Sequence, residues 1–255
     1  MTYGMYLSAS GALIEDARQS VIANNLANSA TAGFKPDRAL FSARLTEARE
    51  GNDVRLDVNP ILERLGGGVF LDEVSYANRQ GAYTRSSNPF HVALRGDGFF
   101  AVTDGASTCY TRAGNFQLGP DGSVLTADGG HRVLSVEGQP IRLEGEGASN
   151  VTIDDQGVMW VGERRIAQLK IVSGGDPADF AKRGDNLFQA RPGVDPAPAP
   201  GTRVQQFLLE DSAVVPIEEM VALIKSYRAF EANMRMLRMQ DESLGKAVNE
   251  VAKLV

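Results

Sequence analysis

The residues that most often carry chemistry in proteins are few in this chain and widely spaced. His91 and His131 are the only histidines, and neither has a cysteine or a pair of carboxylates at a spacing that suits a metal ion. Cys109 is the only cysteine, and Arg112 is the only basic residue within four positions of it. We therefore expect Cys109 to be a buried or semi-exposed structural thiol rather than a nucleophile. These residues give no catalytic candidate and no metal ligand.

Glycine and aspartate also lack the neighbours that would make ligand-binding loops. The run at residues 66–68 is not followed by the Lys-Ser/Thr of a phosphate loop, and Gly96-Asp97-Gly98 lacks a third glycine three residues on. Neither G-x-S-x-G nor H-E-x-x-H occurs. Aspartates gather at Asp-Gly pairs, but no stretch matches the calcium loop D-x-[DN]-x-[DN]-G with Glu at position 12. We interpret these aspartates as turn residues and expect neither an enzyme nor a cofactor.

Composition narrows the class of protein further. Of 255 residues, 43% are hydrophobic, which is enough for a core. The net charge of −6 argues against a nucleic-acid partner. No run of 18 apolar residues occurs, so we expect no membrane insertion. The N-terminus has no basic segment, and Glu15 and Asp16 interrupt any apolar one, so we expect no cleaved signal peptide.

The clearest element is a long helix over Pro216 to Val255. Pro216 suits a first helical turn, and Glu218 and Glu219 complement the helix dipole there. At 1.5 Å per residue the helix spans roughly 60 Å. Its apolar residues recur at alternating steps of three and four, a heptad seam that only Asp241 interrupts. The seam comprises Met220, Leu223, Tyr227, Phe230, Met234, Leu237, Leu244, Val248, Val251 and Val255.

A second helix is predicted over residues 4–28, with a narrow stripe of mostly small apolar residues. It spans about 36 Å and is too short to cover the whole seam. We therefore expect a coiled-coil-like pair in which residues 244–255 contact other subunits, with Asp241 at the boundary. The seam residues expected beside the shorter helix are Tyr227, Phe230, Met234 and Leu237.

The middle of the chain predicts antiparallel β-structure. Asp-Gly pairs flank residues 99–103 and 123–127, and Asp-Gly favours hairpins with type I′ turns. Further strands are expected at residues 69–76, 158–161, 166–172 and 203–210. Residues 39–50 suit either a short helix or a strand. PGVDPAPAPG, residues 192–201, predicts a stiff linker.

Residues 23–35 read ANNLANSATAGFK. Asparagine is unusual inside a helix because its side chain competes for backbone hydrogen bonds. We place Asn24 within the helix, Asn28 near its end, Gly33 at positive φ in the following turn, and Phe34 as the packed exit. Two interpretations remain open: an asparagine-rich helix end, or amides that bond to neighbouring chains in an assembly.

This stretch resembles the N-terminal signature of flagellar rod and hook proteins. Three further stretches resemble segments of the same family in the same order: NPFHVALRGDGFF (88–100), YTRAGNFQLGPDGSVLTADG (110–129) and EEMVALIKSYRAFE (218–231). The resemblance implies a tubular axial structure, with terminal helices from many subunits inside and β-domains outside. It also implies export of unfolded chains through the flagellar type III apparatus.

The resulting hypothesis is an α+β fold with long N- and C-terminal helices forming a coiled-coil-like pair around a central antiparallel β-rich domain. The expected domains are 1–35 with 211–255 as a helical core, 36–87 as an extended connector, and 88–210 as the outer β-domain. The expected assembly interface comprises Asn24, Asn25, Leu26, Asn28, Gly33, Phe34, Met220, Tyr227, Phe230, Met234, Leu237, Leu244, Val248 and Val251.

The function implied is a structural subunit of the basal-body rod, which crosses the periplasm. Its expected partners are copies of itself, related rod and hook proteins, and the export apparatus. At 255 residues the chain is too short for a typical hook subunit. Its two ends, TYGMYLSASGAL and DESLGKAVNEVAKLV, favour the proximal rod, with the distal rod as the alternative. A secreted β-domain with a coiled-coil oligomerisation stalk also fits the pattern, whereas an enzyme would need converging polar groups in the β-domain.

Overall fold

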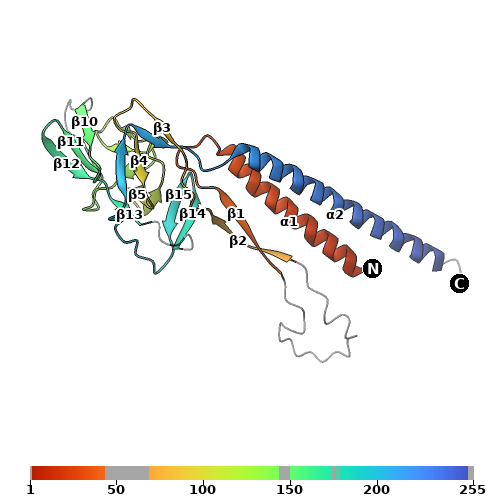
Figure 1. The fold of residues 1–255 in the computed structure, drawn as a ribbon. Coiled ribbons are helices and arrows are strands. Elements are labelled where there is room, and N and C mark those ends of the chain that lie inside the picture. The colour runs from red at the N-terminus through yellow and green to blue at the C-terminus, as the bar shows by residue number, and fades with distance from the viewer. Residues whose placement is uncertain (1, 44–68, 144–149, 174–175, 177–178, 252–255) are drawn as a thin grey trace. The chain divides into compact units, whose positions relative to one another are not determined.

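The computed structural model describes residues 2–43, 69–143, 150–173, 176 and 179–251. Over these residues the chain forms a helix near each end and the strands β1 to β17 between them (Figure 1). The expected α+β class is thus confirmed at the level of two terminal helices and a β-rich centre. Part of the expected connector, residues 44–68, lies outside the described residues.

The chain divides into two compact units. The first unit consists of Met1–Leu26, Asp37–Ser75 and Val215–Val255, and the second of Ala27–Pro36 and Tyr76–Val214. The first therefore holds both helices, and the second holds most of the strands. The three-part domain division expected from the sequence stays a prediction.

Helix α1 spans Thr2–Ala27 and helix α2 spans Pro216–Val251, close to the two predicted helices. Pro216 begins α2, and Glu218 and Glu219 lie in its first turn, as the dipole argument expects. Residues 252–255 lie outside the described residues. The helices run antiparallel side by side (Figure 1): Asn25 near the end of α1 contacts Glu219 near the start of α2. The same unit contains the two-stranded sheet of β1 (Asp37–Ala43) and β2 (Val69–Tyr76).

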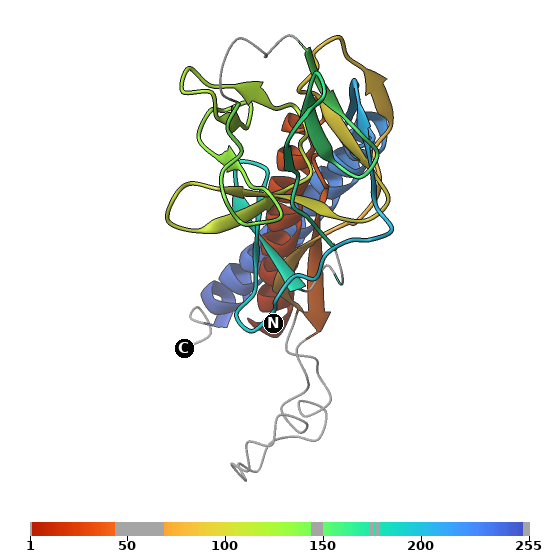
Figure 2. The same ribbon diagram turned by 90° about the vertical axis from the view of Figure 1, so that its left-hand side faces the viewer.

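The second unit is built on an eight-stranded sheet, whose strands face the viewer in Figure 2. Its order is β14 (Phe180–Gly184), β15 (Leu187–Ala190), β6 (Thr108–Thr111), β5 (Phe99–Thr103), β9 (Arg132–Val133), β8 (Val124–Leu125) and β7 (Gln117–Leu118), and β13 (Ile171–Val172) also pairs with β5. All these pairings are antiparallel.

Three smaller sheets complete this unit, and all are antiparallel. They are β10 (Val151–Ile153) with β11 (Val158–Val161) and β12 (Arg164–Gln168), β4 (Val92–Arg95) with β16 (Arg203–Gln206), and β3 (Tyr83–Arg85) with β17 (Leu208–Glu210).

Strand β5 lies at the centre of the hydrophobic core. Successive side chains of a strand point to opposite faces. Phe100 and Val102 accordingly join a large apolar cluster, whereas Phe99 and Ala101 join a second cluster with Tyr76. Because both faces are covered, β5 reads as a continuous apolar run rather than an alternating one.

Several predicted strands are confirmed, and two are divided. Residues 69–76, 99–103 and 158–161 form strands as expected. Of the ambiguous stretch 39–50, residues 39–43 belong to β1, and residues 44–50 lie outside the described residues. The expected strand 166–172 is divided because β12 pairs with β11 while β13 pairs with β5. The expected strand 203–210 is broken at Phe207, whose φ of 61° ends the pairing with β4 before that with β3 begins. The stretch 123–127 forms only the two-residue strand β8.

The Asp-Gly pairs form turns, but their predicted type is wrong. Type I′ needs positive φ at both central residues. Gly105 and Gly122 have positive φ, whereas the preceding aspartates do not. Asp104 instead accepts hydrogen bonds from the backbone N–H groups of Ala106 (2.9 Å) and Ser107 (2.8 Å). The carboxylate therefore stabilises the turn by accepting backbone hydrogen bonds.

Two consecutive residues with positive φ do occur between β14 and β15, at Asp185 (50°) and Asn186 (58°). Asparagine and aspartate tolerate this conformation better than most residues. The backbone pattern of a type I′ turn thus occurs in a hairpin that contains no Asp-Gly pair.

Candidate functional site: the helical pair and a buried ion cluster

The side chains considered for catalysis have structural surroundings. Cys109 is buried, as expected, and its Sγ lies 3.0 Å from Arg183 Nη1, a partner far away in the sequence. His91 is half-buried, its Nδ1 lies 2.7 Å from Ser86 Oγ, and burial lowers its pKa. Within the described residues, no group of three His, Cys, Asp or Glu side chains could hold a metal ion. Neither helix, over its described length, is apolar enough to cross a membrane.

The asparagine-rich stretch makes contacts within the chain. Asn25 is buried, and its side chain brackets the backbone of Asp37: Nδ2 donates to the Asp37 carbonyl (3.0 Å) and Oδ1 accepts from the Asp37 N–H (2.7 Å). Nδ2 also reaches Glu219 Oε1 at 3.4 Å. One amide thus joins the end of α1, the start of β1 and the first turn of α2. Asn24 is exposed and Leu26 is half-buried.

The turn after α1 has the predicted geometry. Asn28 accepts a hydrogen bond from Thr31 N at its carbonyl (3.1 Å), and Gly33 has a φ of 65°. A Cβ on Gly33 would lie 2.5 Å from the carbonyl carbon of Arg112, so only glycine fits this close approach. Phe34 is buried, and Lys182 Nζ lies 4.1 Å from the centre of its ring. Phe34 therefore anchors the exit of the turn, as expected.

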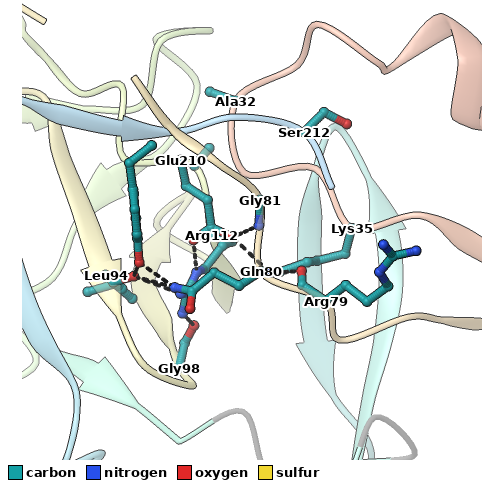
Figure 3. Close-up of polar contacts among 12 residues, drawn as sticks. Ala32, Lys35, Arg79, Gln80, Gly81, Leu94, Gly98, Arg112, Glu210 and Ser212 are labelled. Atoms are coloured by element: carbon teal, nitrogen blue, oxygen red, sulfur yellow. Dashed lines mark hydrogen bonds and ion pairs between the residues drawn. The ribbon is translucent and has the colours of Figure 1, made fainter. Parts of the chain in front are cut away.

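A buried ion cluster lies next to this turn, in the second unit (Figure 3). Lys35, Arg112 and Glu210 are each 2–3% exposed. Glu210 Oε1 accepts from Lys35 Nζ at 2.9 Å, and its Oε2 accepts from Arg112 Nε at 2.6 Å. Burial lowers the pKa of Lys35, and the adjacent Glu210 acts in the opposite direction. One carboxylate therefore pairs with both buried cations, and its removal would take this counter-charge from each of them.

The remaining donors of the cluster are also satisfied. Arg112 Nη1 donates to the Gly98 carbonyl (2.6 Å), and Nη2 donates to those of Leu94 (2.8 Å) and Gly96 (2.7 Å). The Glu210 carboxylate also accepts from the Gly81 N–H at 3.1 Å, and its carbonyl accepts from the Gly33 N–H at 2.7 Å. Figure 3 shows these contacts converging from separate chain segments. The cluster therefore fixes the signature turn to the β-domain backbone around it.

The contacts between the two helices repeat every seven residues on α2. Besides the contact of Glu219 with Asn25, Ser226 Oγ donates to the Glu15 carbonyl at 3.1 Å. A Cβ on Gly11 would lie 2.9 Å from Asn233 Nδ2, and one on Gly4 would lie 2.9 Å from Gln240 Nε2. We call Glu219, Ser226, Asn233 and Gln240 the polar row. The polar row therefore forms one line of contact between α2 and α1.

The positions of α2 that face α1 differ from those predicted from the apolar seam. Tyr227, expected to pack beside α1, is 55% exposed, because the polar row takes the position that faces α1. Met220 and Val248 are exposed as well, and the side chain of Val251 lies outside the described residues. The half-buried members of the predicted seam are Leu223, Phe230, Met234, Leu237 and Leu244.

A second apolar face on α2 was not found from the sequence. Ile217 is 71% exposed and Ile224 is 54% exposed, and Val221 between them is also exposed. These residues recur at steps of three and four, so they form one face of the helix. The spacing of these residues is visible in the sequence, but the longer heptad seam beside them is the stronger periodic pattern. On α1, Leu13 is similarly exposed.

Comparison with known proteins assigns the chain to a family. Three family models match the chain: "Flagella basal body rod protein" over residues 5–35, "Flagellar hook protein FlgE/F/G D1 domain" over 93–161, and "Flagellar basal body rod FlgEFG protein C-terminal" over 204–250. The rod protein FlgG of Caulobacter vibrioides is 32% identical over 93% of this chain and 95% of its own length. The chain belongs to the flagellar basal-body rod protein family.

Other relatives agree with this assignment. FlgF of Caulobacter vibrioides is 28% identical over 100% of both chains, and FlgG of Borreliella burgdorferi is 31% identical over 98% of both. As a member of this family the chain is a structural protein of the basal-body rod, not an enzyme.

The buried ion cluster joins the three segments that the family models match. Lys35 lies in the first, Arg112 in the second and Glu210 in the third. None of the three was predicted from the sequence to have a role, although Lys35 and Arg112 lie within segments that resemble the family. The residues of the two ion pairs are separated by 98 and 175 positions in the sequence. Pairs at such separations leave no local pattern.

Proposed function

We propose that the chain polymerises through its terminal helices into the axial tube of the flagellar rod, in its proximal part. In this proposal α1 and α2 form a coiled-coil-like pair, and the apolar faces that the pair leaves exposed bind the helices of neighbouring subunits. The main observation that supports this proposal is the exposed apolar face formed by Ile217, Val221 and Ile224. This face lies on α2, which also contacts α1. Exposed, contiguous apolar side chains commonly mark an interaction surface.

The length of α2 supports the same proposal. Helix α2 continues beyond the contact between Gly4 and Gln240 as far as Val251. Asp241, the expected boundary, directly follows that contact. Val248, beyond the boundary, is 62% exposed. A solvent-exposed helical extension of this kind gains stability once another subunit packs on it.

The proposed interface retains the residues expected from the sequence and adds Ile217, Val221 and Ile224. Its members differ in how they act. Met220, Tyr227 and Val248 are exposed and available to a neighbour. Asn25, Gly33 and Phe34 are buried, so in this proposal they shape the end of α1 and the turn that follows it rather than touch another chain.

The proposed partners are further copies of this chain and related rod and hook proteins. We also propose that the flagellar export apparatus carries the unfolded chain across the inner membrane, and that the rod crosses the periplasm. The net charge of −6 supports partners other than nucleic acid.

Charge on the α2 extension tests the assembly proposal. The double variant Val248→Lys/Val251→Lys should abolish incorporation into rods, because desolvating two lysines in a helical interface is costly. The β-domain should stay folded, as judged by circular dichroism and Trp160 fluorescence. Ser243→Lys, at an exposed polar position, is the control and should incorporate. Normal rods built from the double variant would refute this role for the extension.

A second pair of substitutions tests the newly found face. Ile217→Lys and Ile224→Lys replace exposed side chains, so each should leave the unfolding midpoint of the monomer unchanged while preventing incorporation. If both variants assemble at the parental level, this face is not part of the interface.

The position along the rod needs its own measurement. Relatives named FlgF and FlgG both match the chain over nearly its whole length, so the proximal assignment rests on the sequences of its two ends. Gold labelling of a tagged chain in isolated basal bodies should mark the membrane-proximal part of the rod. Label confined to the distal part would favour the alternative, a distal rod subunit.

A further inference from the structure

The residue types in the polar row are not those that would make the pairing of α1 and α2 strongest. Glu219, Ser226, Asn233 and Gln240 are spaced by seven residues, the interval that keeps a residue on the line of contact between two helices. All four are polar. Leucine or isoleucine at such positions would bury more apolar surface. Ser226 is nevertheless 2% exposed, so the position is a true contact and not a solvated edge.

The facing positions on α1 are correspondingly small or polar. Gly4 and Gly11 lie against the amides of Gln240 and Asn233, and Asn25 lies against Glu219. Ser8 and Ala12, on the same face of α1, are buried. Asn233 and Gln240 thus each face a glycine, and Ser226 faces a backbone carbonyl. A shift of one helix along the other would separate these matched groups.

The polar contacts are also incompletely satisfied. Glu15 Oε2, Gln19 Nε2 and Gln240 Oε1 are buried, and none has a hydrogen-bond partner among the described residues. Burial raises the pKa of Glu219. Both features weaken the pairing, since burying polar groups costs free energy unless they are fully hydrogen-bonded. A polar residue at a helix–helix contact is best known for fixing register at a cost in stability.

We propose that Ser226, Asn233 and Gln240, with Glu219 at the end of the row, determine the register of α1 on α2. They select a single antiparallel alignment while leaving the apolar residues of α2 for other helices. This inference deepens the proposed function, because a fixed register sets which part of α2 extends past α1. The register itself is a property of a single chain and can be measured without assembly.

Distances between two spin labels in the monomer test the inference. Labels at Leu13→Cys on α1 and Ser243→Cys on α2 occupy exposed positions outside the row, with Cys109→Ala removing the native thiol. The parental row should give one narrow distance distribution. The triple variant Ser226→Leu/Asn233→Leu/Gln240→Leu should give a broad or multiple distribution, because a slip of one heptad moves α2 by about 10 Å.

Two further variants keep the result interpretable. Ser226→Ala/Asn233→Ala/Gln240→Ala removes the polar groups without adding volume, so it should also lose the narrow distribution even if the leucine variant folds poorly. Arg228→Leu/Arg235→Leu/Glu242→Leu is the matched control: it adds three leucines at the same spacing on exposed positions and should keep the narrow distribution.

Three outcomes would overturn the inference: a broad distribution for the parental row, an unchanged narrow distribution for both row variants, or equal broadening by the control. Incorporation into rods is scored separately with the lysine variants of α2. A chain with a fixed register that fails to polymerise would refute the proposed function and leave this inference standing, and the reverse result would do the opposite.

Discussion

Glu210 connects several buried polar groups of the second unit. Its two carboxylate oxygens form separate ion pairs with Lys35 and Arg112. Its backbone carbonyl accepts a hydrogen bond from the Gly33 N–H. Replacing a buried ion pair as a whole can be harmless, but removing one partner leaves a buried charge unpaired. At the residue scale, therefore, the cluster is important because its members cannot be changed one at a time.

Glu210→Gln should lower the free energy of unfolding by about 3–5 kcal/mol, because Lys35 and Arg112 would keep their charge without the carboxylate. Urea unfolding followed by the fluorescence of Trp160, the only tryptophan, measures this loss. The control is Asp155→Asn, which removes an exposed pair with Arg203 at 3.8 Å and should cost about 0–1 kcal/mol. Equal effects of the two variants would contradict this role for the cluster.

Asp104 gives a pH-dependent prediction. Hydrogen bonds from the backbone N–H groups of Ser107 and Ala106, together with the nearby Arg183, lower its pKa from 3.8 to about 2. A depressed folded pKa means that the carboxylate stabilises the folded state above pH 3.8, and that this contribution is lost as the pH falls toward about 2. A carbon-13 NMR titration should place the midpoint near 2, and a midpoint near 3.8 would contradict it. Asp104→Asn should remove this part of the acid sensitivity.

At the scale of elements, two backbone positions decide how segments join. Gly33 lets the turn after α1 approach the backbone of Arg112, and its type and place were predictable from the pattern of a helix end followed by glycine. Phe207 was not predictable, because a phenylalanine with positive φ contradicts local preference. It is held there by its N–H, which donates to the His91 carbonyl at 2.9 Å, and by its carbonyl, which accepts from Ser86 N at 2.9 Å.

Gly33→Ala should destabilise the fold more than Gly138→Ala. Both glycines have positive φ, at 65° and 79°, so both variants carry a strain of about 1–2 kcal/mol. Only Gly33 would also place its new methyl group 2.5–2.6 Å from backbone atoms of Arg112 and Ala113, whereas nothing lies within 4 Å at Gly138. Crowding adds about 1–3 kcal/mol. Thermal unfolding of the two variants compares them, and equal losses would show that the turn can move aside.

At the scale of the whole molecule, the two units are stabilised differently. The second unit has two apolar clusters that cover both faces of β5 and a buried ion cluster. In the first, the row of contacts between α1 and α2 is polar, and much of the apolar surface of α2 is exposed. A unit with this distribution gains stability from partners that cover it, which suits a subunit of a polymer.

Hydrogen exchange of the monomer should show this difference. Amides of β5, Phe99–Thr103, should exchange more slowly than those of α2 by more than about tenfold, and residues 241–251 should exchange fastest within the helix. Incorporation into a polymer should protect α2. Strong protection of Met220–Val251 in the monomer would contradict the expectation that assembly stabilises this helix.

The two helices, the β-rich centre, the turn at Gly33 and the order of the family segments were all predictable from the sequence. Each of these rests on a local signal: a repeat of apolar residues, a glycine after a helix, or a contiguous motif. The sequence also predicted β5 to the residue, because turn residues bound a short apolar run there.

Only the tertiary structure decided which face of α2 meets α1 and which residues bind Glu210. The periodicity of apolar residues shows that a helix has an apolar face, but which face packs on another helix depends on that partner. Here the glycines of α1 lie against residues of the polar row, and Tyr227 of the predicted seam is exposed. The ion cluster joins residues 35, 112 and 210, and contacts at such separations are created by chain folding and have no local pattern.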